Sequence, residues 1–283
     1  VEALNAIRAR YDYVFTTGGI GPTHDDITAD AVAKALGVGV IIHPAARAIL
    51  ELVSIVPGST PLWLPESILQ PEPSEIDACI EGGFLIPSGN TLSFRHELAR
   101  LAISESISYS RSQKLHQQIL LALQEHKGSV PLALFVHHAL GAENEKLVLE
   151  YAPRAAREAS HHGSHREAAR HYQTAMNYSR LLKVEEHAGL MDELSFEYYL
   201  TGQMDPAISL RQDAIKGWRQ AGRDDRTGDD LRWLSRLHWF QGNKLAARQF
   251  SAEAINLLEQ LPPGRELAMA YSNQSQLHML AEE

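Results

Sequence analysis

Three glycines in four positions, followed closely by two adjacent aspartates, form the part of this 283-residue chain best suited to chemistry. Glycine permits backbone geometry and close approach that a side chain would block, so N–H groups of the loop could point at a phosphate. The aspartates could hold a divalent cation or bond a polar heterocycle. The candidate cofactor-binding residues are therefore Gly18, Gly19, Gly21, Pro22, Thr23, Asp25 and Asp26.

The elements around this loop are those of a strand-to-helix connection. Residues 11–17 are rich in aromatic and β-branched types, which predicts a buried strand. Thr28 is a suitable N-cap for a helix over residues 29–36, and residues 38–42 predict a second strand. A helix N-terminus after a glycine loop is a plausible anion site. The alternative is a tight turn with a solvated acidic tip, since the loop is neither G-x-G-x-x-G nor a P-loop.

The stretch TTGGIGPTHDDITADAVAKALG resembles the signature of the molybdopterin-binding (MoCF) family, and its CinA-type branch in particular. This resemblance implies that Gly18, Gly19 and Gly21 bind the phosphate end of molybdopterin or a nucleotide. It also implies that Asp25 and Asp26 support chemistry assisted by Mg²⁺. The resemblance covers only residues 1–50, and the family fold needs strands on both sides. We therefore expect residues 1–50 to be a partial α/β fragment that has no enzymatic activity by itself.

The segment 51–128 predicts a winged-helix module with connecting helices. A helix is expected near residues 74–81, and two apolar strands around Ser88-Gly89-Asn90 predict a β-hairpin. A further helix is expected from His96 to Ser104. His96-Glu97 does not begin the zinc-protease motif H-E-x-x-H, because residue 100 is arginine. Cys79 is expected to be a small core residue.

The stretch GGFLIPSGNTLSFRHELARLAI resembles the region after the ATPase core in large LuxR-type (MalT-like) transcriptional regulators. Phe94 to Arg100 is the sharpest landmark, and the resemblance runs from about Leu52 to Glu283. In that family a winged helix links the nucleotide-binding core to helical repeats. The resemblance thus implies a structural, intramolecular role for the module rather than DNA binding.

An internal repeat with a period of 39 to 40 residues fills the segment 129–283. Gly163, Gly202 and Gly242 begin three segments that align without gaps. Each glycine is followed five and twelve residues later by alanine: Ala168 and Ala175, Ala207 and Ala214, Ala247 and Ala254. Small residues at fixed spacing let packed helices approach closely, so the pattern predicts TPR-like hairpins. Helices are expected near 130–141, 145–161, 165–181, 185–201, 205–221, 225–241, 245–260 and 266–281.

Helical arrays of this kind present a concave binding surface. The candidate partner-binding residues, expected on the first helices of hairpins, are Tyr198, Tyr199, Trp233, Arg236 and Trp239. Core packing is the alternative for aromatics at this spacing. A histidine cluster at 161–171 is expected to be a solvated turn rather than a metal site. Asp224, Asp225, Asp229 and Asp230 are expected in an exposed loop and first turn.

Composition restricts the class of protein. The net charge is −9, which disfavours binding of nucleic acid. No apolar run is long enough to span a membrane. Cys79 is the single cysteine, which fits a reducing, cytoplasmic compartment. The sequence opens without methionine and reads as if it began within a fold.

These observations together predict a mainly α protein with three segments: residues 1–50, 51–128 and 129–283. The first functional hypothesis is a ligand- or protein-sensing repeat segment of a LuxR-type regulator, without its ATPase core or DNA-binding domain. The second is a molybdopterin- or nucleotide-binding, CinA-like protein that uses the Gly18–Asp26 loop. A third interpretation is that two unrelated segments meet near residues 44–52, in a fusion or a partial sequence.

Overall fold

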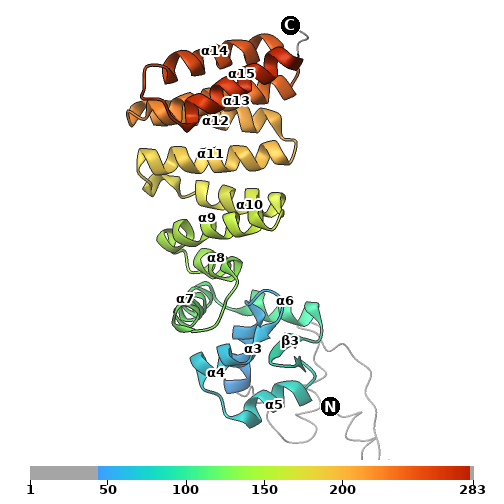
Figure 1. Cartoon of the computed structure of the whole chain (residues 1–283). Helices are drawn as coiled ribbons and strands as arrows, with labels where there is room; N and C mark the ends of the chain where they lie inside the picture. The colour runs from blue at the N-terminus through green and yellow to red at the C-terminus, as the bar shows by residue number, and fades with distance from the viewer. Residues whose placement is uncertain (1–43, 281–283) are drawn as a thin grey trace, which may run out of the picture. The chain divides into compact units, whose positions relative to one another are not determined.

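The computed structural model describes residues 44–280 (Figure 1). The chain divides into two compact units, with the boundary between His126 and Lys127. No helix among the described residues is long and apolar enough to cross a membrane. The two units are described separately below.

The first unit has the element order of a winged helix. A three-stranded antiparallel sheet has the order β1-β3-β2, in which β3 pairs with both neighbours. The elements in chain order are α3 (Pro44–Ser54), β1 (Thr60–Pro61), α4 (Trp63–Leu69), α5 (Pro73–Glu81), β2 (Leu85–Ser88), β3 (Thr91–Phe94), α6 (Glu97–Ser106) and α7 (Tyr109–Glu125). The predicted hairpin is confirmed, and Gly89 in its turn has a φ of 56°, a region that glycine tolerates best.

Helix α3 forms the centre of this unit. Its residues Ile49 and Leu52 are fully buried, as are Leu64, Leu85 and Leu92 of the neighbouring elements. The thiol of Cys79 is buried and contacts the carbonyl oxygen of Ala46, which confirms its expected core position. Helices α5 and α6 both pack on α3.

Polar contacts tie the later helices to α3. Glu51, which is buried, pairs with Arg47 at 2.8 Å and with Arg111 of α7 at 3.1 Å. Arg100 donates to the carbonyl oxygen of Ser54 over 2.6 Å and pairs with Glu97. The Phe94–Arg100 landmark therefore includes a residue that anchors α6 against the end of α3.

The second unit consists of helical hairpins, drawn from green to red in Figure 1. Its elements are α8 (Leu132–Gly141), α9 (Glu145–His161), α10 (His165–Met176), the 3-10 turn η1 (Ser179–Leu181), α11 (Val184–Leu200), α12 (Met204–Gln220), α13 (Asp224–Phe240), α14 (Lys244–Leu258) and α15 (Arg265–Leu280). Helices α9, α11 and α13 pack with α10, α12 and α14 respectively. The predicted helix over 165–181 ends early at Met176, because Asn177 and Ser179 are poor helix formers and the chain turns there.

Repeated alanines and glycines explain why the hairpins form where the sequence predicts. The alanines five and twelve residues after each repeat glycine, from Ala168 to Ala254, are all fully buried between helices. Gly202 closes α11 with a φ of 79°, while Gln203 donates to the carbonyl oxygen of Tyr198 at 2.8 Å. This is the backbone pattern of a glycine-terminated helix. The mainly helical, TPR-like fold class is thus confirmed.

Candidate functional site

The glycine loop that the sequence singles out lies outside the described residues. This holds for all seven candidate cofactor-binding positions from Gly18 to Asp26. Their proposed roles therefore stay predictions. The described residues contain a different candidate site, on helices α11 and α13 of the second unit.

Aromatic side chains from α11 and α13 meet in one cluster. The ring of Trp233 lies 5.6 Å from that of Phe196 and 5.8 Å from that of Tyr199, measured between centroids. Tyr199 in turn lies 5.4 Å from Phe240. We call this cluster, with its neighbours, the aromatic–arginine surface: Phe196, Tyr199, Leu200, Trp233, Arg236 and Phe240.

This surface is open to solvent despite its apolar character. The exposed fractions are 36% for Phe196, 41% for Leu200 and 52% for Phe240. Large apolar side chains that gather at the surface mark interaction sites more often than isolated ones do. Aromatic and arginine residues are also the types enriched where binding energy concentrates in protein interfaces.

Arg236 lies at the centre of the aromatic–arginine surface. Its guanidinium carbon is 5.4 Å from the ring of Phe240, 5.9 Å from Tyr199 and 6.0 Å from Trp233. Its Nη2 donates over 3.5 Å to the Tyr199 hydroxyl, and its buried Nε has no partner among the described residues. Within the same described part of the chain, Arg236 forms no ion pair with a carboxylate.

Three of the five predicted partner-binding residues thus come together: Tyr199, Trp233 and Arg236. The other two take different positions. Tyr198 and Tyr199 both pack against the buried core, but the hydroxyl of Tyr198 accepts a hydrogen bond from Gln173 of α10. Trp239 lies under Lys244, whose Nζ is 5.7 Å from the ring. The concave position expected for all five stays a prediction.

Next to this surface lies a buried polar cluster of Asp192, Arg211 and Asp230, one residue from each of α11, α12 and α13. Arg211 pairs with Asp230 and lies 3.1 Å from an oxygen of Asp192. Its Nη2 also donates to the carbonyl oxygen of Asp192 at 3.0 Å. The guanidinium carbon lies 5.3 Å from the Trp233 ring centroid. Trp233 therefore connects the exposed surface to the buried cluster.

Burial of the two carboxyl groups around one guanidinium favours a single proton between them. Asp192 Oδ1 and Asp230 Oδ2 are buried, and neither accepts a hydrogen bond among the described residues, although Arg211 Nη1 lies 3.1 Å from Asp192 Oδ1. One proton between them would satisfy both oxygens, because a protonated carboxyl donates where a carboxylate can only accept. Burial raises the pKa of Asp230 well above its ordinary value against the opposing charge of Arg211, and the charge of Asp192 raises it further.

Asp192 is the partner better equipped to stay ionised. Burial raises its pKa too, but the charge of Arg211 opposes that rise. The indole N–H of Trp218 donates to Asp192 at 3.1 Å, and Arg226 lies 3.4 Å away. Hydrogen bonds to a carboxylate favour its charged form. We therefore place the shared proton on Asp230 and the negative charge on Asp192.

The buried position of Asp230 corrects one expectation from the sequence. Helix α13 begins at Asp224, so Asp230 falls in its second turn and not in an exposed first turn. Thr227, Asp230, Leu231 and Leu234 are all buried, at helical spacings of three and four. That spacing was readable from the sequence. The run of four aspartates within seven positions obscured it, because acidic residues are mostly exposed.

The histidines of residues 161–171 separate in the structure. His161 and His162 are exposed at the α9–α10 turn, with their rings edge to face. His165 instead bonds the buried carboxylate of Glu197 on α11, over 2.9 Å from Nδ1. Its position helps to join neighbouring hairpins.

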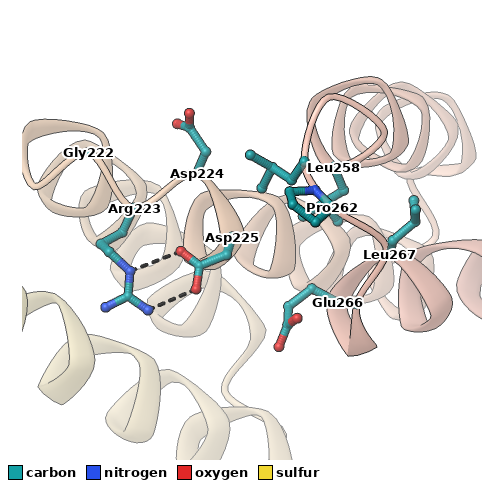
Figure 2. Close-up of a pocket in the computed structure, with 10 residues that line it drawn as sticks. Gly222, Arg223, Asp224, Asp225, Leu258, Pro262, Glu266 and Leu267 are labelled. Carbon is teal, nitrogen blue, oxygen red and sulfur yellow. Dashed lines mark hydrogen bonds and ion pairs between the residues drawn. The ribbon is translucent and has the colours of Figure 1, made fainter.

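A pocket of about 430 Å³ lies between the α12–α13 turn and the α14–α15 connection, and its lining residues are drawn in Figure 2. Leu258, Pro262 and Leu267 form its apolar side. Arg223 is the cation in its lining, and it already donates to both oxygens of Asp225, at 2.9 and 2.8 Å. The pocket therefore offers no unpaired cation to an anionic ligand, unlike the aromatic–arginine surface.

Residues 1–66 match the family described as "Probable molybdopterin binding domain". The match includes the whole Gly18–Asp26 loop and extends through α3 and β1 into α4. It covers less than a quarter of the chain. The resemblance noted for the N-terminal segment is thus confirmed for that segment.

Two bacterial relatives are each similar to a short stretch of the chain. A competence-damage inducible protein of Moorella thermoacetica is 46% identical over 46 residues, which is 16% of this chain and 11% of that protein. A CinA-like protein of a Geobacter species is 45% identical over 51 residues, 18% of this chain and 12% of that protein. The chain therefore spans only a small part of these relatives.

The fold is similar to a solved protein of a different class. A signal transduction ATPase with numerous domains (STAND) from Pyrococcus horikoshii, which has a tetratricopeptide repeat sensor, aligns with a TM-score of 0.50. The alignment covers 92% of this chain and 38% of that protein, at 13% identity. At this identity the likeness concerns the fold alone.

Proposed function

We propose that the repeat unit of this chain is a partner-sensing segment of a LuxR-type, MalT-like ATPase regulator, and that it binds a protein partner through the aromatic–arginine surface. The observation that carries the proposal is the exposed aromatic cluster around Arg236, which has no carboxylate partner among the described residues. The fold neighbour is a STAND protein whose repeats are named as a sensor, which supports this class of function.

The winged-helix unit supports a connecting role in the same proposal. Helix α5 precedes the β2–β3 wing, and it carries Glu75, Asp77 and Glu81 but no lysine or arginine. The hairpin from Leu85 to Phe94 also has no basic residue. Phosphate contact needs a basic surface, so these elements are poorly suited to read DNA.

The test is selection of binders from a random twelve-residue phage-displayed peptide library on the immobilised full chain. Recovered peptides are then titrated against Phe240→Ser and against Leu245→Ser. Both substitutions remove an exposed apolar side chain, but Leu245, which is 80% exposed on α14, lies outside the surface. Only Phe240→Ser should weaken binding, by about thirtyfold, because an interface hot spot contributes about 2 kcal/mol or more.

Equal binding by wild type, Phe240→Ser and Leu245→Ser would show that the peptides bind elsewhere. Recovery of no peptide would also count against the proposal. Far-UV circular dichroism and thermal unfolding of each variant provide the folding control, since both positions are at the surface.

A second function is favoured by the family match to residues 1–66. In this alternative the Gly18–Asp26 loop binds molybdopterin or a nucleotide with Mg²⁺. Calorimetric titration of the full chain with molybdopterin, or with an adenine dinucleotide and Mg²⁺, tests it. Binding heat in the wild type that is lost in the double variant Asp25→Asn, Asp26→Asn would support this function. No binding heat in the wild type would exclude it.

A further inference from the structure

Among the described residues, one of the three arginines around Trp233 has no carboxylate partner. Arg211 has Asp192 and Asp230, and Arg232 has Asp229 at 2.8 Å. Arg236 has only aromatic rings and the long contact to Tyr199, within the described part of the chain. Ring faces attract a cation, but they do not accept the directed hydrogen bonds that a guanidinium donates.

A carboxylate would supply what Arg236 lacks. A guanidinium presents donors in a planar fork that matches the two oxygens of a carboxylate. The exposed rings of Phe196 and Phe240 come from different helices of the same surface, and an apolar group beside the carboxylate could contact them. The surface thus combines one directed charge with adjacent apolar contacts.

We propose that the aromatic–arginine surface binds an acidic polypeptide segment, in which a carboxylate accepts hydrogen bonds from Arg236 and a neighbouring aromatic or aliphatic side chain packs on the exposed rings. This inference rests on the proposed function and specifies the chemistry of its partner.

A polypeptide fits this surface better than a small carboxylic acid does. Small-molecule sites enclose most of their ligand in a concave pocket. Here Leu200 and Phe240 are 41% and 52% exposed, so the apolar groups lie open on two successive hairpins. Repeat arrays bind extended chains over such surfaces. The chain's net charge of −9 does not oppose an acidic partner locally, because Arg236 is not neutralised by a carboxylate among the described residues.

The experiment uses the peptides recovered on the full chain whose binding Phe240→Ser weakens. Each is titrated by fluorescence anisotropy against wild type, Arg236→Met, Arg236→Lys and Arg219→Met. Arg219 is the matched control, because it is an exposed arginine of α12 that pairs with Glu253 away from the surface. Each peptide is also made with its Asp and Glu residues changed to Asn and Gln, which tests the partner chemistry without altering the protein.

We expect Asp or Glu to be enriched next to an aromatic or aliphatic residue in these peptides. Arg236→Met should weaken binding at least tenfold, Arg236→Lys less, and Arg219→Met hardly at all. The amide peptides should lose a similar factor on the wild-type protein. Raising NaCl from 50 to 500 mM should weaken the acidic peptides more than the amide peptides.

Two results separate this inference from the function it rests on. Peptides that Phe240→Ser weakens but that carry no acid, or that bind Arg236→Met and wild type equally, would overturn the acidic-partner inference alone. Peptides indifferent to Phe240→Ser would overturn the proposed function as well.

Discussion

Asparagine at position 230 should have little effect on stability, whereas asparagine at position 192 should destabilise the chain. The two carboxyl groups are buried side by side against the same Arg211, so the chemical change is matched. If the shared proton resides on Asp230, the Asp230→Asn change replaces a neutral acid by a neutral amide that can still donate to Asp192 and accept from Arg211. We expect its free energy of unfolding at pH 7 to stay within ~1 kcal/mol of wild type, as for a retained hydrogen-bond pair.

Asp192→Asn removes the negative charge of the cluster. The Trp218 indole, 3.1 Å away, and Arg226, 3.4 Å away, lose their bonds to an ionised acceptor. Hydrogen bonds to charged groups contribute about 1.5–3 kcal/mol, so we expect a loss of that size. Arg211→Met provides the upper reference, because it leaves both acids buried without their cation, at a cost of about 3–5 kcal/mol.

The pH dependence of the free energy of unfolding tests the protonation of Asp230 independently. The unfolded chain releases the Asp230 proton near the ordinary carboxyl pKa of about 4, while the raised pKa makes the folded chain keep it. The folded state then binds more protons, so its stability falls as pH rises from about 4 to the folded pKa. The fall approaches 1.4 kcal/mol per pH unit for one proton.

Urea denaturation followed by circular dichroism, at several pH values between 4 and 8, measures both effects. The difference in stability between Asp230→Asn and wild type should shift in favour of the variant as pH rises. The reasoning is refuted if that difference stays constant across the range, or if Asp230→Asn costs as much as Asp192→Asn.

Three further predictions concern packing, reactivity and DNA. Gly228→Ala places a Cβ 2.4 Å from Cγ of Leu258, so the variant should lose about 1–3 kcal/mol of stability from overpacking, more than alanine gains in helix propensity. The control is Gly189→Ala, whose Cβ would lie 3.8 Å from Trp218. It should not be destabilised in the same urea titration. Burial raises the pKa of the Cys79 thiol, so an aromatic disulfide reagent should react with this thiol only as the protein unfolds. Rapid stoichiometric reaction of the native protein would contradict the buried position of Cys79. The full chain should not shift an operator fragment at physiological salt in a gel assay, since α5 and the wing lack basic residues, and a shift would disprove the connecting role.

The repeat unit was largely predictable because its signals are local and periodic. Gly202 and Gly242 terminate helices by their own backbone conformation, and Ala207 and Ala247, five residues later, are fully buried between helices. The hairpin at Gly89 is similarly encoded in its turn. Such features need no knowledge of distant contacts.

The candidate site was predictable only in part, because it depends on residues far apart in the sequence. The types of Tyr199, Trp233 and Arg236 indicated a surface, but Phe196 and Phe240 complete it through contacts between successive hairpins. The pairing of Arg211 with Asp230 across 19 residues left no local pattern. Trp239, one residue from Phe240, faces Lys244 instead, because adjacent helical residues point in different directions.

The cluster of Asp192, Arg211 and Asp230 also affects how this array opens. Stacked helical repeats in general can unfold progressively from either end, because each contacts only its neighbours. Here, removing any one of α11, α12 and α13 would leave a buried group of the cluster without its ion-pair or hydrogen-bond partners on the other two helices. We therefore expect the amide hydrogens of these three helices to exchange slowly and together. Unfolding that starts at either end of the array should stop at these helices.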